Sequence, residues 1–219
     1  MLLDRRRGDR RITPPFLATP PPAFPERRQG PRRALDRLQT DLLQRLETLT
    51  NSPVGGPRAV RFEQVLSQIG AYLASAFQVS EEEVGILLMK CGGQLLRFAY
   101  PLELYRGGFN YFPLSVPGIA GRVVRAKEGT VHNDLARIPH LHIYERIRVA
   151  DRPARPIQKM LAVPLLDPTG HPVGVIQVCR KAHTLQGAGP DFTELDLLKL
   201  TDFGRVMAVY LIRFIPDDF

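Results

Sequence analysis

The chain has few cysteines and no long apolar run. Its 219 residues include two cysteines, Cys91 and Cys179, each inside an apolar, strand-like run and not in a spaced pair. This usage argues against a disulfide framework and indicates a reduced interior. The longest apolar run, Val206 to Ile212, is far shorter than the roughly 20 residues that span a bilayer. We therefore expect no membrane insertion.

The N-terminus also lacks targeting features. It has no apolar core that could serve as a signal peptide, and its prolines are incompatible with an amphipathic transit helix. Residues 1–33 hold seven prolines and no periodic apolar pattern, so they cannot bury enough surface to offset the entropy of ordering. The sequence thus predicts a cytoplasmic protein with a disordered tail over residues 1–33.

The formal net charge of +8 is concentrated in this tail. Residues 1–34 hold nine arginines against three acidic residues, a net charge of +6, whereas the rest of the chain holds 21 basic and 19 acidic residues. Two segments, residues 4–11 and 26–33, repeat the form acid, Arg, Arg, x, Gly, x, Arg, Arg. Paired guanidinium groups bind phosphate and carboxylate oxygens well. The tail therefore suits an acidic or phosphate-bearing partner, and the alternative is a solvated tail with no specific partner.

Residues 34–50 are predicted to form an amphipathic helix. Leucines recur there at spacings of three and four, which places them on one stripe. The stripe consists of Leu35, Leu38, Leu42, Leu46 and Leu49. A helix of this length is marginal alone, so the stripe must dock on something. We expect a homodimer in which this stripe and the C-terminal helix form the interface.

After a Pro- and Gly-rich linker over residues 51–58, residues 59–215 read as one domain of helices and strands. Amphipathic helices are expected from Phe62 to Phe77 and, more briefly, over residues 118–127. Gly92-Gly93 can form a tight hairpin turn because both residues can adopt positive φ. The expected strands are residues 84–91, 94–100, 110–115, 130–132, 159–166 and 173–179.

The C-terminal part carries the clearest local signals. A Pro-Thr-Gly turn joins the last two strands, and Gly170 there is free to take a positive φ. Thr193 can then cap a helix, with Asp196 three residues later completing a capping box. Phe192 can pack against Leu197 as a hydrophobic staple. These signals predict a buried hairpin followed by a capped helix.

The order of these elements resembles the GAF domain, a small α/β sensor module. The resemblance lies in Ala162-Val-Pro-Leu165, Gly174-Val-Ile-Gln177 and Phe192-Thr-Glu-Leu-Asp-Leu197, and in Gly118, Ala120, Gly121 and Val123 of the short helix. It covers about residues 59–215. It implies an α+β fold, an antiparallel sheet with helices packed on it. Here that domain would be preceded by an amphipathic helix and a disordered Arg- and Pro-rich tail.

The resemblance also implies a ligand pocket between the sheet, the short helix and the long segment that follows the helix. Such pockets combine apolar walls with a few placed polar groups. The ligand-binding residues that it implies are Phe112, Ser115, Ile119, His132, Asn133, His142, Tyr144, Met160 and Gln177. Each of these could equally belong to the core or fill a loop.

Cyclic-nucleotide-binding members of this family often carry an Asn-Lys, Phe, Asp-Glu signature. In this chain Lys181, Phe192 and Asp196 match three of its positions, whereas Arg180 replaces the asparagine and Leu197 the final glutamate. A cyclic nucleotide is therefore one candidate among small-molecule ligands.

Catalytic chemistry has few candidates in the sequence. His132, His140 and His142 could supply metal ligands together with Cys179, but loop histidines bonded to the backbone and a small core cysteine explain the same residues. Cys91 and Cys179 lie on expected strands, whereas GAF-type methionine sulfoxide reductases carry their cysteines in loops around the pocket. We expect no catalytic residue and no metal site, and the cofactor stays unknown.

The sequence thus favours a non-enzymatic sensory or regulatory module that binds a small molecule and signals through dimer helices. The alternative is a protein–protein interaction module with a collapsed pocket, whose arginine-rich tail recruits a partner. A third hypothesis, from another class, is an enzyme or redox sensor that uses the cysteines.

Overall fold

A six-stranded antiparallel sheet organises the chain, in the strand order β3-β2-β1-β6-β5-β4. The computed structural model describes residues 29–51, 56–90, 92–107, 111–136, 138, 155–217 and 219, with the side chains of the first helix described from residue 36. The strands are β1 Val84–Lys90, β2 Leu95–Tyr100, β3 Tyr111–Pro113, β4 Thr130–His132, β5 Ile157–Leu166 and β6 Pro172–Lys181. Each expected strand is present.

Glycines form the turns of both predicted hairpins. Gly92 and Gly93 have φ values of 64° and 86°, as the tight β1–β2 turn requires. Gly170 has a φ of 81° between β5 and β6, where the Asp167 carboxylate accepts hydrogen bonds from the backbone N–H groups of Thr169 and His171. An L-residue with a side chain would be strained at these positions.

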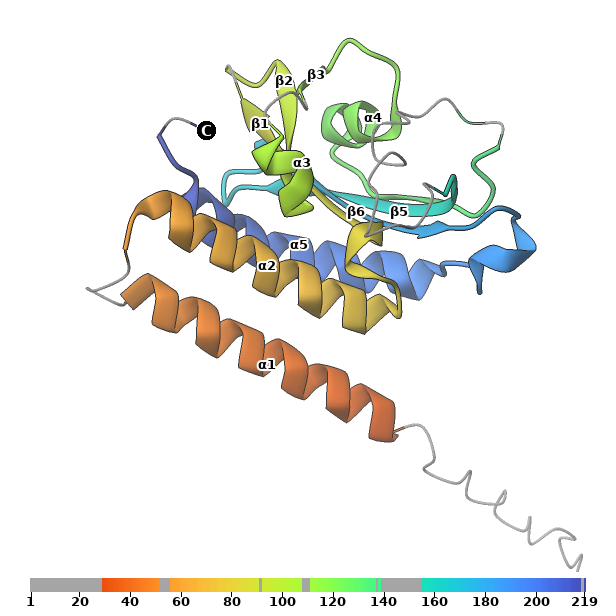
Figure 1. Cartoon of the computed structure of the whole chain (residues 1–219), viewed down its shortest axis with the longest axis horizontal. Coiled ribbons are helices and arrows are strands. Elements are labelled where there is room, and N and C mark those ends of the chain that lie inside the picture. The colour runs from red at the N-terminus through yellow and green to blue at the C-terminus, as the bar shows by residue number, and fades with distance from the viewer. Residues whose placement is uncertain are drawn as a thin grey trace, which may run out of the picture.

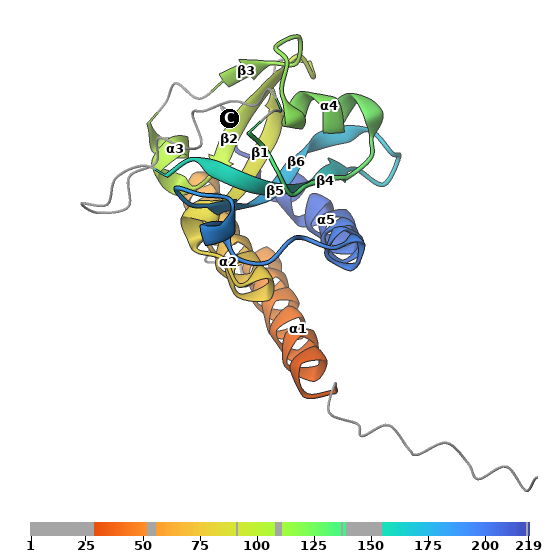
Figure 2. The same ribbon diagram turned by 90° about the vertical axis from the view of Figure 1, so that its right-hand side faces the viewer.

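The helices form layers on the two faces of the sheet. The helices α2 and α5 lie side by side on one face, α1 forms a further layer outside them, and α4 covers the opposite face (Figures 1 and 2). The α-helices are α1 Gln29–Asn51, α2 Arg58–Phe77, α3 Leu102–Arg106, α4 Ile119–Ala126 and α5 Glu194–Phe214, with short 3-10 turns η1 Glu81–Glu83 and η3 Gln186–Ala188. Within the described residues, none of the helices combines the length and apolar character needed to cross a membrane.

The leucine stripe of α1 docks on its own chain. Leu42 and Leu46 are buried and join the core that α2 and α5 form with the sheet, whereas Leu38 is 41% exposed. The helix begins at Gln29, five residues before the helix predicted from the leucine pattern. Pro31 fits that first turn because the N–H groups there have no partner within the helix. Part of the stripe expected to join two copies therefore has its partner within the chain.

The start of α5 has the predicted cap. The Thr193 hydroxyl accepts a hydrogen bond from the Asp196 N–H at 3.2 Å, and the Asp196 carboxylate accepts from the Thr193 N–H at 2.9 Å. Phe192 is buried and Leu197 packs against the same core. This capping box is worth about 1 kcal/mol in a typical helix, and it fixes where α5 begins.

Two apolar cores lie on opposite sides of the sheet, because successive residues of a strand point to opposite faces. Leu161 and Val163 of β5 belong to the core under α2 and α5, whereas Met160 and Ala162 belong to the core under α4. The helix α3 was not predicted, because five residues are too few for a periodic pattern. The helical patch expected near residues 141–147 lies outside the described residues.

Docking of α1 on its own domain predicts unequal effects of two leucine truncations. Leu46→Ala removes a fully buried side chain and should lower the free energy of unfolding by about 2–5 kcal/mol. The matched control Leu38→Ala, on the exposed part of the same helix, should change it by less than about 0.5 kcal/mol. Thermal and urea unfolding of the full chain measure both. Equal effects of the two substitutions would contradict the docking of α1.

Candidate functional site

The α4 face of the sheet holds the residues from which a binding site could be built. Its core is formed by side chains of β1, β2, β3, β5, β6 and α4, and α4 lies over β5 and β6. Three predicted site residues are buried in this core: Phe112 on β3, Ile119 at the start of α4 and Met160 on β5. The face is therefore largely apolar, as in many ligand pockets.

Gln177 is a buried polar residue on this face. It lies on β6 between Val175 and Cys179, which both belong to the α4-side core, so alternation along the strand directs Gln177 to the same side. The residue is 5% exposed. Among the described residues, no side-chain hydrogen bond joins its amide to another group. The amide is not one of the fully buried side-chain atoms without a partner, which in the described residues are Arg61 Nε, Gln68 Oε1 and Arg180 Nε.

Small neighbours flank the Gln177 side chain. In the sheet register Gln177 pairs with Gly85 of β1 on one side and with Ala162 of β5 on the other. Directly opposed residues of antiparallel strands share a face, so the two nearest cross-strand side chains are a hydrogen atom and a methyl group. Thr130 of β4 follows Ala162 in the same row. Within this row, the Thr130 hydroxyl is therefore the nearest polar side-chain group.

His132 lies one row away on β4, opposite Met160. Its Nε2 is 3.0 Å from the Thr130 hydroxyl oxygen. Partial burial, and to a smaller extent the positive charge of Arg122 on α4, lower the pKa of His132 below its ordinary value. The imidazole is therefore neutral near pH 7 and offers one donor and one acceptor.

Asn133 uses its amide to join two elements. Its Nδ2 donates to the Phe192 carbonyl and its Oδ1 accepts from the Phe192 N–H, both at 2.9 Å. This pair of bonds holds the end of β4 against the residue just before the α5 cap. Both amide atoms of Asn133 are therefore engaged in a structural contact.

Ser115 lies apart from the buried residues. It is exposed and lines a surface cleft of about 570 Å³ together with Gly118, Arg122 and Arg125. Arg125 also donates to the Leu114 carbonyl. The other two predicted site residues, His142 and Tyr144, lie outside the described residues.

The three residues that match the cyclic-nucleotide signature have structural contacts. Lys181 Nζ donates to the Glu82 carbonyl at 2.8 Å, and burial lowers the pKa of this lysine. Asp196 closes the α5 capping box. Phe192 is buried and stacks under the Arg180 guanidinium, 4.8 Å from the ring centroid. These contacts explain the three residues without a nucleotide.

Metal and thiol chemistry gain little support from the described residues. No group of three or more His, Cys, Asp or Glu side chains gathers there as metal ligands would. Cys179 is fully buried in the α4-side core, where a thiol packs as a small apolar side chain. Cys91, His140 and His142 lie outside the described residues.

Sequence analysis missed the residues that make Gln177 distinctive. Gly85 and Ala162 flank its amide only because of the strand register, which no local pattern encodes. Thr130 and Lys181 also lie on the α4 face, but neither is among the predicted site residues. Once the strand order is known, the alternation of side chains along each strand places Thr130 and Lys181 on the α4 face.

Comparison with known proteins agrees with this architecture. A family model described as "GAF domain" matches residues 59–211. The GAF domain of an Acinetobacter phosphoenolpyruvate-protein phosphotransferase superposes with a TM-score of 0.54 at 19% identity, over 80% of this chain and 94% of the other. The corresponding Coxiella burnetii GAF domain gives a TM-score of 0.56 at 11% identity, over 82% and 93%. The A. aeolicus nlh2 GAF domain, in an inactive state, gives 0.51 at 17% identity, over 81% and 98%.

The chain belongs to the GAF domain family, whose members are commonly small-molecule sensing or regulatory modules. Its α+β fold is the GAF fold, as the sequence motifs predicted. At these low identities the superpositions establish the fold alone. Among curated proteins, no sequence matches the chain significantly.

The lowered pKa of His132 predicts a pH-dependent contribution to stability. The unfolded imidazole has a pKa of about 6.5, so between that value and the lower folded pKa the unfolded state binds more protons. Stability from this residue is therefore present above about pH 6.5 and is lost as the pH falls. Urea unfolding of the wild type and His132→Gln at pH 8 and pH 5 should show the wild type losing more stability. A difference between the two proteins that stays constant with pH would contradict this.

Proposed function

We propose that this protein is a sensory or regulatory module, without catalytic activity, that binds a small molecule between α4 and the sheet. The observation that carries the proposal is Gln177, a polar residue of 5% exposure on this largely apolar face, whose side chain makes no hydrogen bond among the described residues. Family membership supports it, because GAF domains are commonly small-molecule sensing modules. The largely apolar surroundings favour binding over catalysis, since they offer few groups for proton transfer or nucleophilic attack.

The energetic argument concerns what a ligand must supply to the Gln177 amide. Burying an amide without a hydrogen bond costs about 1–3 kcal/mol in proteins. A ligand that covers this amide avoids that cost only if it supplies both a donor and an acceptor.

The polar groups of this face indicate the chemistry of the ligand. Gln177 offers two donors and one acceptor with two lone pairs, and His132 is neutral at pH 7. Thr130 adds a hydroxyl. We infer a small, mostly apolar molecule with an uncharged edge that both donates and accepts, such as an amide or a heterocycle. The base of a cyclic nucleotide has such an edge, so cyclic nucleotides stay in the panel of candidates.

Strand β5 offers a route from this site to the helices. Met160 and Ala162 lie on the α4 side, whereas Leu161 and Val163, between and beside them, pack on the helix side. Because α5 packs directly on β5, a ligand that shifts β5 would also shift the surface under α5. We propose that α5 is the element through which occupancy is signalled.

The alternative function is a protein–protein interaction module whose α4-side space is closed. Phe112, Ile119 and Met160 are all buried in one cluster, which favours this reading. In that case the arginine-rich tail would bind an acidic or phosphate-bearing partner. Deleting residues 1–33 would then abolish partner binding, whereas a small-molecule sensor would keep its ligand.

The proposed role of Gln177 predicts the outcome of an amide-to-leucine substitution. Gln177→Leu removes an amide that makes no hydrogen bond among the described residues, so the ligand-free protein should keep its stability to within about 0.5 kcal/mol. The matched control is Gln158→Leu on β5, whose amide donates to the Ala182 carbonyl at 2.8 Å. That substitution should destabilise the protein by about 1 kcal/mol. Destabilisation by Gln177→Leu comparable to that of the control would show that the amide has a structural partner.

Ligand binding itself is tested by native mass spectrometry of the purified full chain, followed by thermal melts with the molecules released. A ligand at about 100 times its dissociation constant should stabilise the wild type by roughly 2.7 kcal/mol. Gln177→Leu should lose most of that stabilisation while keeping its fold. Equal stabilisation of wild type and variant would place the ligand elsewhere.

A further inference from the structure

The outward face of α5 carries apolar residues that nothing in the described chain covers. Leu195, Leu198, Val209 and Ile212 are between 37% and 59% exposed. They lie opposite the face that packs on the sheet, which is buried from Leu200 to Phe214. Contiguous exposed apolar residues are typical of interaction surfaces, and here they form two groups, one toward each end of α5.

The stripe has the spacing of a coiled-coil seam. Its positions follow one another at intervals of three and four residues, the alternation of the a and d positions of a heptad. In order they are Leu195, Leu198, Asp202, Arg205, Val209 and Ile212. The two ends of the seam are apolar and its centre is charged. Asp202 and Arg205 are both mostly exposed and lie 3.4 Å apart in the same helix.

This pattern is complementary to itself when reversed. In an antiparallel pair of α5 helices centred between Phe203 and Gly204, Leu195 faces Ile212 of the second copy, and Leu198 faces Val209. The central positions then bring Asp202 of each copy opposite Arg205 of the other. A parallel pair would instead bring Asp202 against Asp202 and Arg205 against Arg205, and like charges at an interface are repulsive. The charges therefore select the antiparallel orientation.

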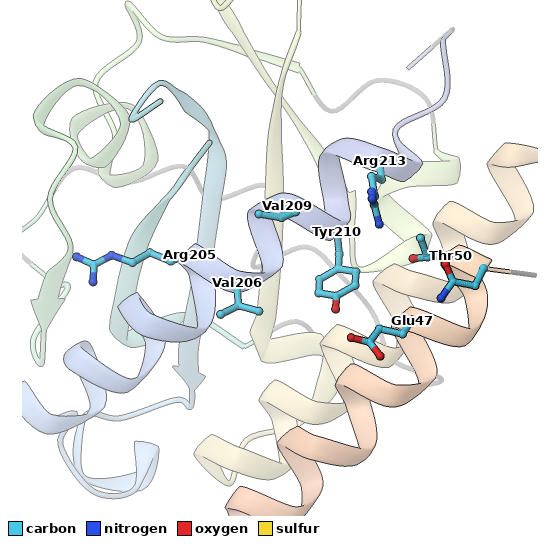
Figure 3. Close-up of a pocket in the computed structure, with 8 residues that line it drawn as sticks. Glu47, Thr50, Arg205, Val206, Val209, Tyr210 and Arg213 are labelled. Carbon is cyan, nitrogen blue, oxygen red and sulfur yellow. The ribbon is translucent and has the colours of Figure 1, made fainter. Parts of the chain in front are cut away.

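A groove beside the seam gives the second helix a place to lie. It has a volume of about 750 Å³ and runs between the C-terminal turns of α1 and the C-terminal half of α5. Val206, Val209 and Arg213 form its α5 wall, and Tyr210 points from α5 toward Glu47 on α1 (Figure 3). Lys199 lies on the same side of α5 as Val206 and Tyr210. In an antiparallel pair, Lys199 of the second copy therefore brings its positive charge toward Glu47 of the first.

We propose that two copies of this chain pair through α5, antiparallel and about a two-fold axis, with Asp202 and Arg205 forming reciprocal ion pairs at the centre. A two-fold interface requires this kind of self-complementary surface. The sequence predicts a dimer interface formed by the leucine stripe and the C-terminal helix. The proposed interface keeps the C-terminal helix and leaves out the stripe, because Leu42 and Leu46 are already buried within their own chain. The pairing does not depend on the small-molecule ligand. Loss of the dimer would therefore leave the proposed ligand binding untouched, and absence of a ligand would leave the proposed pairing untouched.

Charge reversal tests the pairing directly. Asp202→Arg places arginine opposite arginine at two symmetric positions, and Arg205→Asp places aspartate opposite aspartate. Each single variant should weaken the dimer by about tenfold or more. The double variant D202R/R205D restores opposite charges and should restore the dimer. The measurement is sedimentation equilibrium of the full chain at tens of micromolar, where the wild type should have twice the 24.6 kDa chain mass.

Two leucine substitutions control for the surface involved. Leu198→Arg lies in the seam and should give a monomer, whereas Leu38→Arg, on the exposed part of α1, should leave the dimer intact. Thermal melts should show that all variants are folded, since every substituted side chain is exposed. A monomeric wild type, a dimer broken by Leu38→Arg, or a double variant that stays monomeric would each overturn the proposal. So would single charge variants that dimerise like the wild type.

Discussion

Burial of β5 and β6 on both faces is the constraint on which the rest of the structure depends. The two strands pair with each other along their length, and most of their residues are buried. Such strands need a layer on each side of the sheet. The α2–α5 pair supplies one layer and α4 the other, and α1 covers part of the first. A polar residue on these strands must find a partner in the protein or in something that the protein binds.

The buried polar residues of this region show how that requirement is usually met. Lys159 donates to the Gly189 carbonyl and to the Asp191 carboxylate, both at 2.7 Å. Glu83 accepts from the Lys181 N–H at 2.6 Å and from Ser80. Both sets of bonds lie where β5 begins and β6 ends, next to loops that supply partners. Gln177 lies in the middle of its strand, and within the described residues no loop group bonds to its amide.

Local chemistry determined how much of the fold could be predicted. The Gly92-Gly93 turn, Gly170 and the Thr193 cap are properties of a few consecutive residues, and the structure has each of them. The partner of the α1 stripe could not be predicted, because a leucine pattern specifies a face and not what covers it. The same limit applies to the site. The family motif includes Gln177, but the motif does not show that its cross-strand neighbours are small. Those neighbours, Gly85 and Ala162, come from two other strands of the sheet.

The row Gly85, Gln177, Ala162 also bears on how the α4 face of the sheet could change during evolution. Two of its three members carry the smallest side chains available, and both are held by backbone pairing that does not depend on those side chains. Replacing Ala162 by serine or valine would alter the shape and polarity of this face while leaving the ladder in place. The α4 face can therefore diverge between relatives through single substitutions at one strand position, with the scaffold left unchanged.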